Sequence, residues 1–307
     1  MKKTIYCIVG PTASGKTSLS IALAKQINAE IISADSMQIY QDLDIATAKV
    51  TKEEMDGVVH HMIDICPINQ NFSVADFKDM CYHKIKDIIA REKNVIIVGG
   101  TGLYISAVVQ NMQFIEEIID TSYREELTKL AQEKSPSVLY EMLQQCDPES
   151  AKYIHPNNVK RVIRALEMAK NHNTLKSQHM EQEKRRLQSE DIPYEFKVYE
   201  IVFPREVLYE RINKRVDKMI EQGVVEEAKK VYEMGLSMDN TCMQAIGYKE
   251  FFPYFEGKCT LDEAIAILKQ DTRKYAKRQM TWFRHKLKTI PLEGTRGTEY
   301  MLNQILE

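Results

Sequence analysis

The sequence lacks the features that would mark a membrane or secreted protein. No apolar run approaches the roughly 20 residues that a membrane-spanning helix needs, and a strand-like apolar stretch starts at Thr4, which leaves no room for a signal peptide before it. The six cysteines include no C-x-x-C pair, so the pattern of a zinc ribbon or a redox motif is missing. We therefore expect a cytoplasmic protein with reduced cysteines and no contact with a membrane.

A strong charge of either sign is also lacking. The chain has 42 Lys and Arg against 44 Asp and Glu, a formal net charge of −2, so the overall balance argues neither for nor against nucleic acid. Hydrophobic residues make up 44% and charged residues 28% of the 307 residues, which is ordinary for a globular protein. This length is sufficient for one large domain with an insertion or for two domains.

The clearest motif is a glycine-rich run, GPTASGKT at 10–17, between a predicted strand (4–9) and an amphipathic stretch (18–26). Strand, loop and helix in this order are typical of a P-loop. Glycines let backbone N–H groups turn inward, the helix N-terminus and a lysine add positive charge, and a threonine hydroxyl can sit on Mg²⁺. We expect a diphosphate site formed by Gly10, Thr12, Ala13, Ser14, Gly15, Lys16 and Thr17, with Thr17 as the metal ligand. The motif leaves open which diphosphate it binds, since its backbone contacts only phosphate oxygens.

Two more strand ends should lie near this loop, because the carboxyl ends of strands in a βα sheet line the ligand crevice. Asp35 follows a short predicted strand around Ile31 and Ile32 and is either a functional carboxylate or a helix N-cap. The run GGTGLY at 99–104 follows the β-branched strand 94–98. Its glycines predict close backbone approach by a ligand, with Thr101 as the polar contact, or else only a tight strand-to-helix turn.

Two adjacent histidines, His60 and His61, open a predicted strand over 60–65. Neighbouring side chains on a strand point to opposite faces, so the pair does not form a metal site. We interpret both as structural.

Residues 116–192 lack strand patterns and are rich in charged helix formers, which predicts a helical insertion between core segments 1–115 and 193–307. Lys160, Arg161 and Arg164 share one face of a predicted helix over 157–171. Such a face is either a solvated surface or a contact for RNA phosphates. Residues 176–191 are charged enough to be a mobile segment.

Positive charge gathers near the C-terminus. Between Lys269 and Lys288 there are eight basic side chains and one acidic residue, Asp271. Tyr275, Trp282 and Phe283 lie among them on a predicted helix from 261 to about 284, available for base stacking or for core packing. This combination favours a nucleic-acid contact.

Taken together, four stretches resemble the bacterial tRNA dimethylallyltransferases, also called tRNA isopentenyltransferases, of the IPP transferase family: GPTASGKT at 10–17, SADSMQIY at 33–40, GGTGLY at 99–104 and KRQMTWFR at 277–284. The resemblance extends to NNVKRVIRALE at 157–167 and GYKE at 247–250. It implies a P-loop α/β fold, a parallel sheet flanked by helices, with a helical insertion domain that contacts the tRNA anticodon stem-loop. The implied reaction transfers a dimethylallyl group from dimethylallyl diphosphate to N6 of adenosine 37, just 3′ of the anticodon, with Mg²⁺ as cofactor. We expect the chain to act as a monomer.

The resemblance also implies roles for particular residues. Asp35 would accept the proton from the adenine amino group, while Lys16 and Thr101 would stabilise the leaving diphosphate. Arg215 is our own candidate for a further phosphate contact. The implied tRNA contacts are Asp35, Ser36, Met37, Gln38, Thr101, Tyr123, Arg124, Val159, Lys160, Arg161, Arg164, Gln244, Gly247, Lys249, Arg278 and Trp282. The alternatives are an enzyme that prenylates free adenine nucleotides, a P-loop small-molecule kinase that uses ATP, and an RNA-binding P-loop protein without chemistry.

Overall fold

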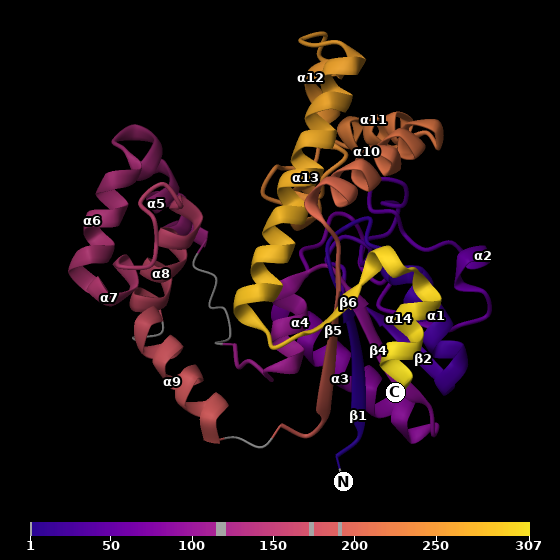
Figure 1. Cartoon of the computed structure of the whole chain (residues 1–307). Coiled ribbons are helices and arrows are strands. Elements are labelled where there is room, and N and C mark those ends of the chain that lie inside the picture. Colours follow the sequence, from indigo (N-terminus) through magenta and orange to yellow (C-terminus); the bar gives the residue numbers. More distant parts are fainter. Residues whose placement is uncertain (1, 115–120, 172–174, 190–191) are drawn as a thin grey trace. The chain divides into compact units, whose positions relative to one another are not determined.

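Two structural units make up the chain in its computed structural model, which describes residues 2–114, 121–171, 175–189 and 192–307. One unit contains Met1–Asn111 together with Ile192–Glu307, and the other contains Met112–Asp191 (Figure 1). The sequence placed the breaks at 115/116 and 192/193. Each unit has its own hydrophobic core and is described separately below.

The first unit is built on a parallel sheet with the strand order β3-β2-β4-β1-β5-β6 among the described residues. The strands are β1 (Thr4–Val9), β2 (Ala29–Ser33), β3 (His60–His61), β4 (Asn94–Gly99), β5 (Glu195–Val202) and β6 (Ile290–Glu293). Strand β1 lies between β4 and β5, with Val9 opposite Gly99 and Glu200. The loops that leave β1 and β4 therefore start side by side, at the carboxyl edge where parallel sheets bind ligands.

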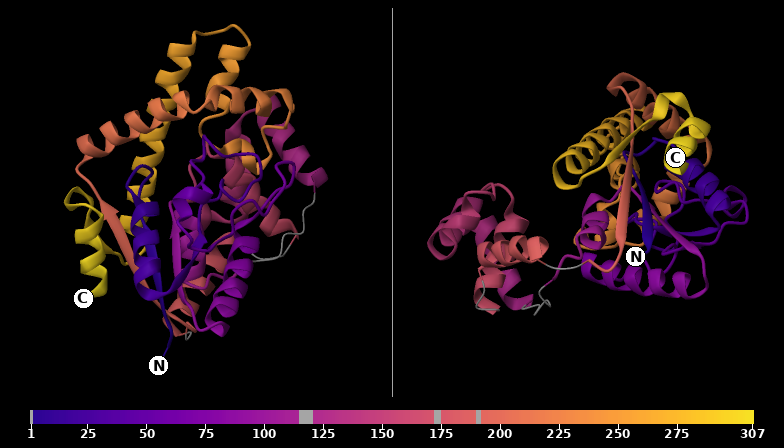
Figure 2. Two further views of the ribbon diagram at one scale, coloured as in Figure 1. Left: turned by 90° about the vertical axis from the view of Figure 1, so that its right-hand side faces the viewer. Right: turned by 60° about the horizontal axis from the view of Figure 1, so that its bottom comes forward.

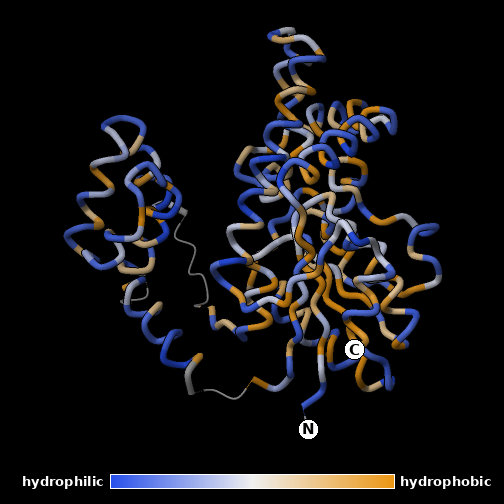
Figure 3. Tube along the Cα trace, viewed as in Figure 1, coloured by the Kyte–Doolittle hydropathy of each residue, from blue (hydrophilic) through white to orange (hydrophobic). Residues whose placement is uncertain are grey.

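Both faces of the sheet are covered by helices, which explains why its strands are almost continuously apolar. On β2, Ile31 packs into the core under α1 (Lys16–Ile27) and α14 (Thr298–Leu306), while the next residue, Ile32, packs into the core under α3 (Val74–Ala90) and α4 (Gly102–Val109). Figure 3 shows the apolar residues concentrated along the strands. Alternate side chains of each strand therefore supply the two cores.

Further helices lie beyond the carboxyl edge of the sheet (Figures 1 and 2). The main ones are α10 (Arg205–Glu221), α11 (Val224–Glu233) and α13 (Leu261–Lys286). Helix α13 is tied to α10 by an ion pair between Lys269 and Asp217 at 2.5 Å and by a hydrogen bond from Arg273 to Asn213 at 2.7 Å. The short elements of this unit are α2 (Lys52–Met55), η1 (Thr241–Gln244), η2 (Lys249–Phe251), α12 (Phe252–Phe255) and η3 (Gly294–Arg296).

The second unit is helical: α5 (Thr121–Glu133), α6 (Pro136–Cys146), α7 (Pro148–Ala151), α8 (Val159–Asn171) and α9 (Lys176–Ser189). Its core contains Leu127, Leu143 and Val162. Residues 176–189 of the charged segment that we expected to be mobile form the helix α9, and 190–191 lie outside the described residues. The buried Asp147 carboxylate accepts a hydrogen bond from the Ser177 amide at 3.0 Å, which holds the first turn of α9.

One predicted strand is much shorter than expected. The strand predicted over 60–65 covers only His60 and His61, because Met62 and Asp64 have φ angles of 66° and 56°, which end the extended backbone. His61 hydrogen-bonds the buried Glu30 at 2.7 Å, and His60 Nδ1 lies 2.9 Å from the Val58 carbonyl oxygen. Both contacts agree with the structural interpretation of the pair, which stays a prediction. Within the described ranges, no helix is long and apolar enough to cross a membrane.

Candidate active site

The loop between β1 and α1 has the conformation that a phosphate cradle requires. Gly10 and Gly15 have φ angles of 148° and 89°, which side chains rarely allow, and a Cβ on Gly10 would lie 3.0 Å from the Ile201 carbonyl oxygen. Lys16 Nζ reaches back over the loop and donates to the Pro11 carbonyl at 2.7 Å. The buried Ser14 hydroxyl has no hydrogen-bond partner in the part of the chain that the structure describes. A phosphate oxygen would satisfy it.

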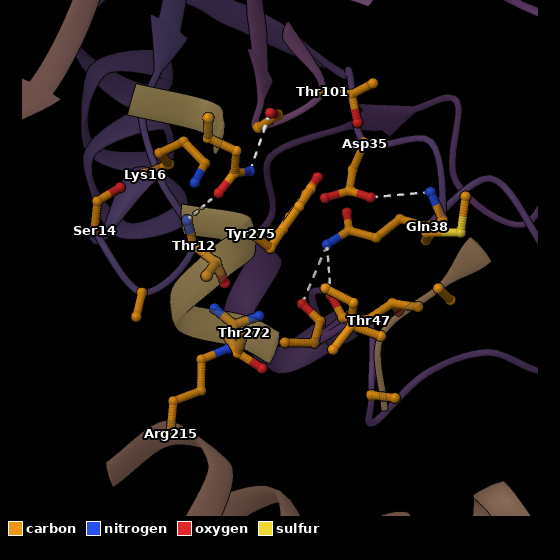
Figure 4. Close-up of a pocket in the computed structure, with 18 of the residues that line it drawn as sticks. Thr12, Ser14, Lys16, Asp35, Gln38, Thr47, Thr101, Arg215, Thr272 and Tyr275 are labelled. Carbon is orange, nitrogen blue, oxygen red and sulfur yellow. Dashed lines mark hydrogen bonds between the residues drawn. The ribbon is translucent and has the colours of Figure 1, made fainter. Parts of the chain in front are cut away.

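Positive charge is held close to this loop by α10. Arg215 lies in the same cavity as Lys16 (Figure 4). Burial, together with Arg215, lowers the pKa of Lys16 to about 7, and burial lowers the pKa of Arg215. Arg211 Nε donates to the Ala13 carbonyl at 2.8 Å, which joins α10 to the loop. The Asp35 carboxylate acts in the opposite direction and raises the pKa of both cations. A bound anion would favour their charged forms further.

Asp35 lies opposite, just after β2. It does not cap a helix, since residues 36–39 form a turn. One carboxylate oxygen accepts a hydrogen bond from the Met37 amide at 2.9 Å, and the other points toward Tyr275 (Figure 4). Thr101 steadies the same turn, because its hydroxyl accepts from the Ser36 amide at 3.0 Å and donates to the Ser36 hydroxyl at 3.2 Å. The two strand ends are thus linked by hydrogen bonds.

The glycines around Thr101 allow close contacts within the chain. A Cβ on Gly99 would lie 2.1 Å from the Ala34 carbonyl oxygen, one on Gly100 would lie 2.2 Å from Gln279 Nε2, and one on Gly102 would lie 2.3 Å from the Trp282 ring. The close approach is therefore made by other parts of the chain. Gly100 and Gly102 also line the cavity described below, so the predicted approach by a ligand stays a prediction.

Two residues of α13 have roles that the sequence reasoning missed, since it named Tyr275 only for base stacking or core packing and did not single out Gln279. Gln279 is buried, accepts from the Thr12 amide at 2.9 Å and donates to the Gly100 carbonyl at 3.0 Å, so it links the two glycine-rich turns. Tyr275 faces the cavity beside Asp35, and burial together with that carboxylate raises the pKa of Tyr275. Positions 275, 279 and 282 share one helix face. That spacing, combined with the motif, was the signal that could have found them.

These groups line one cavity of about 830 Å³ in the first unit. Of the predicted residues of that unit, the following line it: Thr12, Ala13, Ser14, Gly15, Lys16, Thr17, Asp35, Ser36, Met37, Gln38, Thr101, Arg215, Gln244, Arg278 and Trp282. Gly10, Gly247 and Lys249 do not. Gly247, with φ 112°, packs instead against Ala46, where a Cβ would lie 2.6 Å from the alanine Cβ, and Lys249 begins η2.

The basic cluster on α13 is partly used within the protein. Lys269 and Arg273 bind α10, and Lys274 pairs with Asp271 at 2.9 Å. Trp282 donates to the Ser106 hydroxyl at 3.0 Å and Phe283 is fully buried, so these aromatic side chains pack in the protein. Arg278 is exposed at the cavity, with its guanidinium 5.6 Å from the Tyr275 ring.

The remaining predicted contacts lie in the helical unit. Arg124 donates two hydrogen bonds, of 2.7 and 2.9 Å, to the buried Glu167, and the Lys170 ammonium lies 3.6 Å from the centre of the Tyr123 ring. Both side chains therefore have structural contacts. Val159 packs against the core of this unit, Lys160 and Arg161 are exposed, and Arg164 Nη1 lies 3.9 Å from Glu167.

Comparison with known proteins agrees with this geometry. The model of the family described as "IPP transferase" matches residues 38–286. The chain belongs to the IPP transferase family. It is 51% identical over 291 residues to a protein of Bacillus pumilus named tRNA dimethylallyltransferase, a match that covers 94% of this chain and 89% of that protein. A protein of the same name from Bacillus cytotoxicus is 48% identical over 296 residues, covering 96% and 92% of the two chains.

Solved structures extend the likeness to the fold. The crystal structure of a tRNA delta(2)-isopentenylpyrophosphate transferase from Staphylococcus epidermidis matches with a TM-score of 0.72 and 44% identity, over 99% of this chain and 98% of that one. A eukaryotic dimethylallyltransferase acting on tRNA matches with a TM-score of 0.80 and 29% identity, over 99% of this chain and 77% of that one. The predicted P-loop α/β fold with a parallel sheet flanked by helices is confirmed.

Proposed function

We propose that this protein transfers a dimethylallyl group from dimethylallyl diphosphate to N6 of adenosine 37 in tRNA. The observation that carries the proposal is a cavity in which a phosphate cradle and a carboxylate face each other. Its volume of about 830 Å³ is ample for a prenyl diphosphate beside a purine base. The names of the family relatives support the same reaction.

The P-loop would stabilise the diphosphate leaving group. As the bond between the allylic carbon and the diphosphate oxygen breaks, negative charge builds on that oxygen. The loop amides, Lys16, Arg215 and the Ser14 hydroxyl are placed to stabilise it. Binding of the anion favours the charged form of Lys16, whose pKa burial and Arg215 otherwise lower to about 7.

Asp35 would act as the general base for the attacking adenine amino group. The adenine amino nitrogen is a weak nucleophile, because its lone pair is delocalised into the ring, so its attack requires the loss of a proton. As the new C–N bond forms, one N6 proton passes to the Asp35 oxygen that the Met37 amide leaves unoccupied. Thr101 holds the turn that carries this carboxylate. In its observed geometry it is a positioning group, and its predicted direct contact with the diphosphate stays a prediction.

A magnesium ion fits this site only together with the substrate. The described residues include no group of three or more Asp, Glu, His or Cys side chains that could hold a metal by themselves. Thr17, exposed at the cavity, and the diphosphate oxygens would hold Mg²⁺, which usually binds largely through substrate phosphates. When bound, the ion would neutralise charge on the leaving diphosphate.

The tRNA would be bound by both units. A base inside a structured loop must leave its stack to reach a buried carboxylate, and Asp35, Ser36, Met37 and Gln38 line the cavity that would receive it. Arg278 at the cavity, with Lys160 and Arg161 on the helical unit, would contact phosphates of the anticodon stem-loop.

The test is a product analysis by mass. The protein, Mg²⁺ and an anticodon stem-loop RNA are incubated with dimethylallyl diphosphate or with ATP, and one added C5H8 on adenosine is the expected product. Phosphoryl transfer from ATP, or prenylation of AMP without prenylation of RNA, would refute the proposal. Asp35→Asn should abolish turnover and leave stem-loop binding nearly unchanged. The exposed neighbour Asp42→Asn, as the matched control, should retain both.

A further inference from the structure

The carboxylate of Glu227, on α11, is enclosed by backbone amides from a distant segment. Its Oε2 atom accepts from the amides of Asp44 at 3.1 Å and Ile45 at 2.8 Å, and its Oε1 atom accepts from the amide of Ala46 at 3.0 Å. The hydroxyl of the buried Tyr248 donates to the same Oε1 atom at 2.9 Å. Three consecutive amides converging on one carboxylate form a charge-assisted anchor. We call residues 44–48 the clamped loop.

The clamped loop in turn sets the orientation of the Gln38 side chain. Gln38 Nε2 donates to the carbonyls of Thr47 at 3.3 Å and Ala48 at 3.2 Å, and its Oε1 atom accepts from the Ser33 hydroxyl at 3.2 Å. The opposite orientation would direct the amide oxygen at two carbonyl oxygens, which repel it. Both Nε2 hydrogens are thereby committed to the loop. Oε1 keeps one lone pair available, because a carbonyl oxygen accepts two hydrogen bonds.

The clamped loop and Gln38 form one wall of the cavity, and a residue outside the cavity positions this wall. Ala46, Thr47 and Ala48 line it together with Gln38, whereas Glu227 does not. Gly247 also restrains the clamped loop, because it packs closely on Ala46. Loss of the Glu227 carboxylate would release three amides at once and let the two carbonyls that orient Gln38 move.

We infer that Glu227 is a positioning residue that keeps Gln38 a hydrogen-bond acceptor, so that the site selects a base with an exocyclic amino group. The inference rests on the proposed function and adds a base specificity to it. Adenine N6 carries two hydrogens, and the site offers one acceptor for each: Gln38 Oε1 and the Asp35 carboxylate. Hypoxanthine has a carbonyl oxygen at that position, which would face two acceptors and be repelled.

The experiment measures binding without the prenyl donor, so that no transfer is needed. Fluorescence anisotropy gives the affinities of two anticodon stem-loops that differ only in adenosine or inosine at position 37. The wild type should prefer adenosine by about tenfold or more, the size expected when a buried acceptor loses its donor. Glu227→Gln should reduce the preference to about threefold, because its amide hydrogens repel the loop amides while Asp35 still disfavours a carbonyl oxygen. Glu226→Gln, on the exposed face of the same helix, should keep it.

Two results would overturn the inference: equal binding of both RNAs by the wild type, or an unchanged preference in Glu227→Gln. A variant that is merely destabilised would lower both affinities together and leave their ratio unchanged, so a fall in both without a change of the ratio also counts against it. Tyr248→Phe, which removes one of the donors to Glu227, should give an intermediate ratio. The proposed function is tested separately by the product analysis, and it fails if the wild-type protein adds no C5H8 to RNA.

Discussion

The link that Gln279 makes between the two glycine-rich turns gives a prediction with a calculable size. Gln279→Met keeps a side chain of similar length but removes both the acceptor for the Thr12 amide and the donor for the Gly100 carbonyl. An unsatisfied buried polar group costs about 1–3 kcal/mol. The bond to Gly100 is buried, whereas the bond to Thr12 is partly accessible to water, so we expect a total loss of about 2–4 kcal/mol in the free energy of unfolding.

Urea unfolding followed by tryptophan fluorescence tests this, since Trp282 is the single tryptophan of the chain and lies in the sheet-bearing unit. Gln270→Met, at an exposed position of the same helix, is the matched control and should change stability by less than about 0.5 kcal/mol. We also expect the KM for dimethylallyl diphosphate to rise in Gln279→Met, because Thr12 belongs to the cradle. Equal stability of the two variants would refute the reasoning.

Three further predictions concern charge and packing around the cavity. Because the pKa of Lys16 is lowered to about 7, Lys16 is mostly neutral at pH 8, and binding of inorganic diphosphate there should take up close to one more proton in the wild type than in Lys16→Arg. Below about pH 6 Lys16 is already charged, so the difference in proton uptake between the two proteins should vanish. Calorimetry in buffers of different ionisation enthalpy measures the proton uptake. Equal uptake by the two proteins at pH 8 would contradict the prediction. Gly102→Ala should destabilise the protein by about 1–3 kcal/mol, because its methyl group would lie 2.3 Å from the Trp282 ring; an unchanged urea midpoint would show that the ring moves at no cost. Arg278→Ala should weaken stem-loop binding and lower the slope of log K against log salt by about one in magnitude, and a salt titration that leaves the slope unchanged would exclude a phosphate contact.

The local features of the site could be predicted from the sequence. The phosphate cradle is a continuous strand, loop and helix whose conformation depends on glycines and a lysine a few residues apart, so the order of residues 4–26 was enough. Asp35 could be placed near it because the carboxyl ends of parallel strands meet at one edge. The structural interpretation of His60 and His61 needed only the alternation of side chains along a strand. These inferences use spacings that the backbone itself imposes.

Only the tertiary structure decided which distant groups complete the site. Gln279 meets Thr12 from 267 residues away, and Glu227 meets the clamped loop from about 180 residues away. Neither pairing leaves a periodicity in the sequence, because a hydrogen-bond partner is selected by how helices cross the sheet and not by local spacing. For the same reason the glycines beside Thr101 could be recognised as sites of close approach, while the approaching groups, Gln279 and Trp282 among them, could not. The sequence alone determined the chemistry available at each strand end, and the packing of α10, α11 and α13 over those ends decided which side chains orient it.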